Sequence, residues 1–196
     1  GKDSFAISNK PKEPEKEKNE PSFNDIASHW AKNEILKMSE SGVISGYEDG
    51  SFKPDNSITR AEFVKILTGM LALPNGTGNA FSDVTEDKWF APFVYAASKY
   101  GIINGVTENT FAPDKTITRE DATLILYRVL SKRSVSFNKS LGFSDSEQIS
   151  DYAKEAVGNL AAAEILKGNN GLFRPKDSLS RAETVTMLSI SSGYIK

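Results

Sequence analysis

The strongest constraint on the fold of this chain is one motif that recurs three times at a spacing of about 60 residues. The arginines of "SITRAEF", "TITRED" and "LSRAE" stand at positions 60, 119 and 181, which are 59 and 62 residues apart. In each copy a Phe precedes a Pro by two residues, and that Pro precedes the Arg by six. A unit of this length cannot bury its apolar face alone, so the three units must pack into one body.

Each unit has two segments with helical periodicity on either side of a loop rich in Gly and Pro. In the second unit, the first segment has an apolar face at i, i+3, i+4 and i+7, formed by Phe90, Phe93, Val94 and Ala97. "RAEFVKILTGML" shows the same periodicity after the loop of the first unit. The sequence therefore predicts a mainly α fold of three helix–loop–helix repeats. The second helices are expected to form the central core, with very short strands at most in the loops.

The predicted repeats cover residues 23–72, 81–131 and 143–196 and form one domain. Residues 1–22 are predicted to be the end of an upstream region followed by a charged linker of Pro, Lys and Glu. Such a segment cannot bury apolar surface and serves as a solvated spacer.

Composition excludes several classes of function. With 24 basic and 26 acidic side chains the chain lacks the positive charge of a general nucleic-acid binder, and no apolar run is long enough for membrane insertion. There is no cysteine and a single histidine, His29, which is expected at a helix start. "SGYEDGSFKPDN" lacks the final Glu and two further acids of a calcium loop. We therefore expect no metal, no cofactor and no enzymatic activity.

The position of the repeated arginine indicates an anion site. In the first copy Thr59 and Glu62 have the spacing of a capping box, which places Arg60 at the first helical residue. A cation is mildly unfavourable there, yet it strengthens the attraction of free backbone N–H groups for an anion. A guanidinium can bind a carboxylate through two parallel hydrogen bonds. The alternative is internal pairing with Asp25, Asp83, Asp145 or a capping acid on another element.

Several further motifs recur in order: Phe-x-Asp, His-Trp-Ala or Lys-Trp-Phe, Gly-Tyr-x-Asp-Gly-x-Phe-x-Pro-Asp and Ile-Thr-Arg-Ala-Glu. Over residues 23–190 this set resembles the S-layer homology (SLH) domain of bacterial surface proteins. The resemblance implies a pseudo-threefold bundle in a secreted protein at the cell wall, with S-layer neighbours as further candidate partners. It also implies non-covalent binding of a secondary cell-wall polysaccharide, through a pyruvylated terminal sugar such as N-acetylmannosamine, in grooves between repeats.

The resemblance and the motifs together give a set of candidate ligand-binding residues: Arg60, Arg119, Arg181, Gly46, Gly105, Gly168, Trp30, Trp89, Asp25 and Asp83. Each type has an alternative structural role. The glycines fit a turn with positive φ, the tryptophans fit a helical core, and Glu62, Asp121 and Glu183 fit helix caps.

The three copies are not equally complete. Glu120 replaces an alanine in the second unit and adds a negative charge beside Arg119, which predicts weaker anion binding there. The third unit has Tyr152 in place of a tryptophan and a loop one residue shorter. The first unit therefore has the most complete set. A different class of function, a protein-interaction or lattice scaffold without glycan affinity, remains open.

Overall fold

The computed structural model describes residues 22–132 and 142–195, so almost all of the predicted linker at 1–22 lies outside the described residues. Six α-helices follow one another along the chain: α1 (Lys32–Glu40), α2 (Arg60–Met70), α3 (Ala91–Lys99), α4 (Arg119–Ser131), α5 (Asp151–Ala162) and α6 (Arg181–Ser191). Two short 3₁₀ helices occupy Ser146–Gln148 and Ser192–Tyr194. Over these ranges β structure is limited to isolated bridges, which confirms the mainly α prediction.

The starts of the second helices follow from their capping residues. The Thr59 side chain accepts a hydrogen bond from the Glu62 N–H, and the Glu62 carboxylate accepts one from the Thr59 N–H. Ser180 and Glu183 form the same reciprocal pair at α6. Each capping box gives a hydrogen-bond acceptor to two backbone N–H groups that a helix start otherwise leaves unpaired. The helix therefore begins at the arginine that follows the cap.

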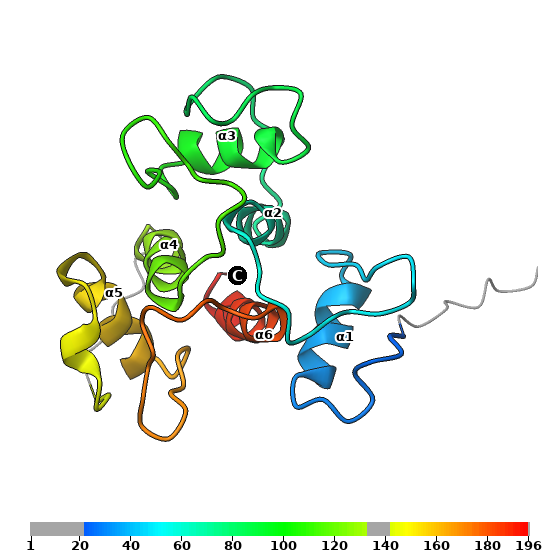
Figure 1. Ribbon diagram of the computed structural model, residues 1–196, viewed down its shortest axis with the longest axis vertical. Coiled ribbons are helices and arrows are strands. Elements are labelled where there is room, and N and C mark those ends of the chain that lie inside the picture. Colours follow the sequence, from blue (N-terminus) through cyan, green and yellow to red (C-terminus); the bar gives the residue numbers. More distant parts are fainter. Residues whose placement is uncertain (1–21, 133–141, 196) are drawn as a thin grey trace, which may run out of the picture.

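The second helices α2, α4 and α6 surround the middle of the molecule, and the first helices α1, α3 and α5 lie outside them (Figure 1). Each first helix packs against the second helix of the preceding repeat: α3 on α2, α5 on α4, and α1 on α6. Glu34 of α1 also accepts a hydrogen bond from Ser189 of α6. The packed pair is therefore made by two neighbouring repeats, and the third repeat closes on the first.

Backbone hydrogen bonds beside the second helices complete this ring. The Ile58 N–H donates to the Leu179 carbonyl, Leu179 donates to Ile117, and Ile117 donates back to Ile58, with N···O distances of 3.0, 3.0 and 3.1 Å. In this closed cycle each repeat donates one hydrogen bond to another repeat and accepts one from the third. The cycle also makes folding of the three repeats interdependent, because each one supplies a donor and an acceptor to another.

One apolar core runs through all three repeats. Its largest fully buried side chains include the three loop phenylalanines, Phe52, Phe111 and Phe173, together with Phe63 of α2. The first phenylalanine of each repeat packs on the loop phenylalanine, with ring centroids 5.4 to 5.7 Å apart. None of the helices in the described part of the chain is both long and apolar enough to cross a membrane.

Candidate ligand grooves

Three grooves open between the repeats, and each is assembled from parts of all three. Each combines an arginine at a helix start, the loop and second helix of the next repeat, and an aromatic residue of the repeat after that. The Arg60 groove lies between Arg60, residues 103–106, α4 and Tyr152. The Arg119 groove lies between Arg119, residues 165–169, α6 and Trp30. The Arg181 groove lies between Arg181, residues 42–45, α2 and Trp89.

This sharing changes how the repeats can be ranked. The arginine of the first repeat faces the loop of the second and the tyrosine of the third, so no groove belongs to a single repeat. The first unit has the most complete set of motif residues, but that set does not form one site, because its members belong to different grooves.

The grooves have volumes of about 410, 460 and 340 Å³, within the range of small-ligand sites.

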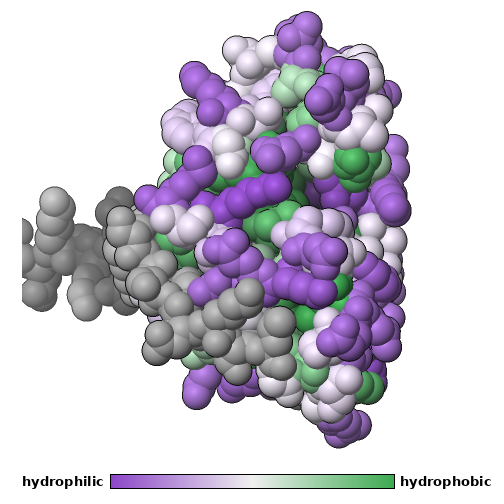
Figure 2. Space-filling view, turned by 90° about the vertical axis from the view of Figure 1, so that its left-hand side faces the viewer, coloured by the Kyte–Doolittle hydropathy of each residue, from purple (hydrophilic) through white to green (hydrophobic). Residues whose placement is uncertain are grey.

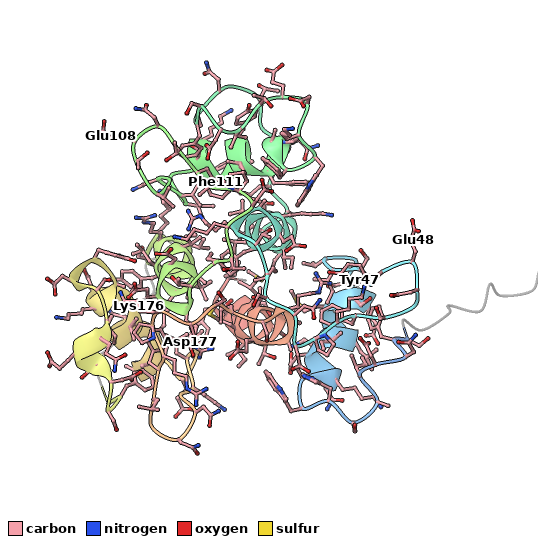
Figure 3. The ribbon with its side chains drawn as sticks, viewed as in Figure 1. Tyr47, Glu48, Glu108, Phe111, Lys176 and Asp177 are labelled. Carbon is pink, nitrogen blue, oxygen red and sulfur yellow. The ribbon has the colours of Figure 1, made fainter. Side chains whose placement is uncertain are left out.

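The three arginines share one structural contact. Each donates a hydrogen bond from Nε to the carbonyl of the loop phenylalanine in the next repeat: Arg60 to Phe111 at 2.8 Å, Arg119 to Phe173 at 2.7 Å and Arg181 to Phe52 at 2.9 Å. Each guanidinium also lies over the ring of that phenylalanine, 4.6 to 5.6 Å from its centroid. Figure 3 labels Phe111 where its loop meets the central helices. Every arginine thus helps to join two repeats.

The remaining guanidinium donors differ between the grooves. Arg60 Nη1 lies 3.3 Å from a carboxylate oxygen of Asp121, and Arg119 Nη1 lies 2.6 Å from one of Glu183. Within the described ranges no carboxylate forms an ion pair with Arg181, whose Nη2 donates to the Ser45 carbonyl at 3.3 Å. Internal pairing therefore holds for two of the three arginines, and their partners stand at the third position of the next second helix.

The capping acids divide in the same way. Glu183 uses one oxygen for the Ser180 N–H and the other for Arg119. Glu62 uses one oxygen for the Thr59 N–H and makes no ion pair with a described residue. The capping prediction is confirmed for both glutamates. Asp121 does not reach back to its own cap, because its shorter side chain bonds Arg60 and Tyr152 instead.

Asp25 and Asp83 hold the loops and do not line the grooves, so the ligand contact predicted for them is replaced by a structural role. The Asp25 oxygens accept from the Phe52 and Lys53 N–H groups at 2.8 and 2.7 Å, and Asp83 makes the matching pair in the second repeat. Burial alone would raise the pKa of Asp25, but these N–H donors lower it overall. Lys53 has φ of 56°, a left-handed conformation that the two hydrogen bonds to Asp25 stabilise.

The three glycines face the first phenylalanine of their repeat. A Cβ at Gly46 would come within 2.4 Å of the Phe23 ring, and one at Gly168 within 2.8 Å of Phe143. At Gly105 a Cβ would also meet two backbone oxygens at 2.5 Å, and φ is +78°. The positive-φ interpretation is therefore correct for Gly105 alone. A side chain at these positions would therefore collide with the protein itself. Gly105 and Gly168 also line the Arg60 and Arg119 grooves, so the predicted contact of these glycines with a ligand stays a prediction.

The aromatic residues at the starts of the first helices are exposed. Trp30 and Trp89 retain 64% and 55% of their surface, which contradicts the interpretation of these residues as core. They stand at the edges of the Arg119 and Arg181 grooves, where a ring face is open to a ligand. His29 supports the helix start as predicted, because its Nδ1 accepts a hydrogen bond from the Ala31 N–H.

Glu120 points away from Arg119, so the predicted repulsion of an anion at Arg119 has no basis in the geometry. The carboxylate is buried and accepts from Ser150, the Tyr152 hydroxyl and Lys176, the last at 2.5 Å. Burial on its own would raise the pKa of Glu120, but Lys176 and the other donors lower it overall. Figure 3 labels Lys176 beside α4 and α5. Glu120 thus joins the second repeat to the third.

Sequence reasoning missed two basic residues on the outer faces of the second helices. Lys65 lines the Arg181 groove, and Arg128 lines the Arg60 groove. Both residues lie one or more turns after the arginine motif, on the face of the helix that the apolar pattern leaves to solvent. A basic residue at such a position was the sequence feature that could have indicated them. Burial lowers the pKa of Arg128, against the opposing effect of Asp121. Among the described residues no group of three His, Asp or Glu could hold a metal ion.

Figure 2 views the left-hand side of Figure 1, where hydrophilic side chains cover most of the surface and apolar ones show only between them. A face of this kind suits contact with water or a polar partner better than contact with an extended apolar partner.

A sequence profile of the S-layer homology domain matches three parts of this chain, residues 22–64, 80–123 and 142–185. The similar curated proteins include an amylopullulanase of Thermoanaerobacterium thermosulfurigenes, 35% identical over 85% of this chain and 9% of its own length. A cellulosome-anchoring protein of Acetivibrio thermocellus is 32% identical over 76% of this chain and 35% of its own length. The S-layer protein sap of Bacillus anthracis is 29% identical over 85% and 21%. The chain thus spans a minor part of each relative.

Proposed function

This chain belongs to the S-layer homology family, and from that premise we propose that its grooves bind a cell-wall polysaccharide through a carboxylate-bearing terminal sugar. Family membership, with S-layer and anchoring proteins among the relatives, supports a cell-wall-associated module that anchors its protein at the cell surface. The finer step concerns the chemistry of the ligand, for which a pyruvylated sugar is the best candidate.

The observation that carries this proposal is the pairing, in one groove, of a fixed guanidinium with an exposed aromatic ring. A pyruvyl ketal carries a carboxylate, and a guanidinium can bind it through charge-assisted hydrogen bonds worth roughly 1.5–3 kcal/mol each. The C–H face of a sugar can lie on the ring of Trp89 beside it. Such a ligand offers a carboxylate and an apolar C–H face, and the groove offers a guanidinium for the first and an aromatic ring for the second.

Three grooves on one domain also suit a polymer. When one chain end is held, binding of a second end of the same cell-wall layer becomes effectively intramolecular. Even weak single sites would then give durable attachment without a covalent bond. The enzymes among the relatives match this chain over a small share of their length, and we propose no catalytic role for the described residues.

Isothermal titration of the domain with a pyruvylated N-acetylmannosamine glycoside tests the proposal. The methyl ester of the pyruvyl group is the matched control, since it keeps the sugar and removes the charge. We expect binding of the acid and at least tenfold weaker binding of the ester. Absence of binding to either compound, combined with retention on cell walls stripped of their secondary polymer, would favour a protein-binding scaffold instead.

A further inference from the structure

We infer that the three arginines are unequal and that Arg181 is the principal ligand contact. This inference rests on the proposed function and adds to it which groove binds first. In the Arg60 and Arg119 grooves a carboxylate of the protein itself occupies the guanidinium. In the Arg181 groove that place is left for the carboxylate of the ligand.

Arg181 is held in position without being neutralised. Its Nε donates to the Phe52 carbonyl and its Nη2 to the Ser45 carbonyl, and only 9% of the residue is exposed. Two of the five guanidinium N–H donors are thereby used, and Arg181 is one of the residues that line the groove. The guanidinium also lies 5.0 and 4.6 Å from the ring centroids of Tyr47 and Phe52. A cation fixed in this way binds an anion with little further loss of side-chain freedom.

The other two grooves already contain the interaction that a ligand would make. A ligand carboxylate at Arg119 would have to displace Glu183 at 2.6 Å. At Arg60, which is 4% exposed, it would have to displace Asp121, which also accepts from the Tyr152 hydroxyl. Exchange of one carboxylate for another at the same guanidinium gains little free energy, so these sites are weak.

Glu62 does not close the Arg181 groove in the same manner. It forms its capping box with Thr59 but no ion pair with Arg181. Lys65 on the same helix adds a second cation to this groove, with its Nζ 5.6 Å from the centre of the Trp89 ring. A carboxylate bound there meets two positive groups and one aromatic residue, in a groove that Glu62 also lines.

The Arg60 groove is the strongest competitor, because Lys115 and Arg128 also line it. These charges attract anions over several ångströms, and such attraction is screened beyond about 8 Å at physiological salt. Arg128 donates a hydrogen bond to the Ile102 carbonyl at 3.4 Å. We assign this groove a supporting role that depends on salt concentration.

Two matched substitutions test the inference. Glu183→Gln keeps a capping-box residue and removes the charge that occupies Arg119, while Glu62→Gln makes the same change in the Arg181 groove. Titrated with the pyruvylated glycoside, Glu183→Gln should gain a second site of comparable affinity. Glu62→Gln should not add a binding site, because Glu62 makes no ion pair with Arg181. Equal effects of the two changes would overturn the inference.

Arg181→Gln and Arg119→Gln complete the test, with circular dichroism and melting temperature as checks on folding. We expect at least a tenfold loss of affinity for the Arg181 variant and less than a twofold loss for the Arg119 variant. The reverse order would refute the assignment while leaving the proposed function intact. Failure of the wild type to bind would instead refute the proposed function. If Arg181→Gln does not fold, the Glu183→Gln result alone decides.

Discussion

The Arg181 and Arg119 grooves share an arginine, its contact with a loop and a tryptophan, but they differ in the rest of their lining and in the pairing of the arginine. Both have an arginine at a helix start, an Nε bond to a loop carbonyl and an exposed tryptophan at the edge. The Arg119 groove then has a largely apolar wall, formed by Ile165, Leu166, Leu179, Met187 and Ile190, and its arginine is paired with Glu183. The Arg181 groove is lined by Lys65 and Glu62, and within the described ranges no carboxylate forms an ion pair with its arginine. The Arg119 groove also has one lysine, Lys167.

This difference shows that the repeated motif encodes the joints between repeats more directly than it encodes a binding site. The arginine and the loop phenylalanine make the same contacts in all three places. The acid two residues after the arginine differs, because Asp121 and Glu183 pair with the arginine of the preceding repeat and Glu62 pairs with none. A threefold motif can therefore build one strong site and two weaker ones.

The largest expected effect is that of Glu120→Ala, which tests whether Glu120 influences anion binding at Arg119 or stabilises the contact between two repeats. Replacing Glu120 with alanine restores the residue found at the matching positions, Ala61 and Ala182. If the sequence-based expectation is right, anion binding at Arg119 should improve. The geometry instead predicts unchanged binding and a loss of about 2 kcal/mol in the free energy of unfolding, because Ser150 and Lys176 lose their shared acceptor. Urea denaturation at pH 7, with glycan titration alongside, distinguishes the two.

The pH dependence of this loss follows from the sign of the shift. The pKa of Glu120 is lowered in the fold, so the unfolded chain binds the proton more readily. The stabilisation is therefore complete above the ordinary glutamate pKa of about 4.3 and is lost as pH falls through the lower folded value. The gap in melting temperature between wild type and Glu120→Ala should begin to narrow below about pH 4 and close as pH falls through the lower folded pKa. A gap that does not narrow at all on acidification would argue against the carboxylate as its source.

The next effect compares the two tryptophans. Trp89→Ala should weaken glycan binding roughly tenfold, about 1.4 kcal/mol, because the ring stands beside Arg181 and Lys65. Trp30→Ala should change affinity less than twofold, since it borders the groove whose arginine is occupied. Both rings are exposed, so neither change should lower the melting temperature appreciably. Equal losses in titration would remove the distinction between the grooves.

Much of the fold could be predicted because it rests on local patterns. Periodicity located the helices, and the Thr59–Glu62 spacing located a cap that the structure contains. Interleaving could not be predicted in this way. Packing of α1 on α6 joins residues about 150 positions apart, and no local pattern states which repeat a helix will cover.

The candidate site was predictable in its residue types and less so in their roles. Arg60, Arg119 and Arg181 all line grooves. The carboxylates that pair with Arg60 and Arg119 come from other repeats, 61 and 64 residues away, whereas Arg181 donates to the Ser45 carbonyl and pairs with no described carboxylate. Asp25 was a reasonable ligand candidate because a motif acid can face either a ligand or its own backbone. Only the fold places its oxygens on the Phe52 and Lys53 N–H groups.

The smallest effect tests whether the Arg119 groove is purely structural. Thr186 lines it, and the Thr186 Oγ1 is buried without a hydrogen-bond partner among the described residues. Thr186→Val removes that hydroxyl at nearly constant shape and should raise the free energy of unfolding by about 1 kcal/mol. Thr123→Val is the control, because its hydroxyl donates to the Arg119 carbonyl at 2.7 Å, and it should be neutral or destabilising. Thermal unfolding measures both. Glycan affinity should not respond to Thr186→Val, and any change beyond twofold would show that the Arg119 groove takes part in binding.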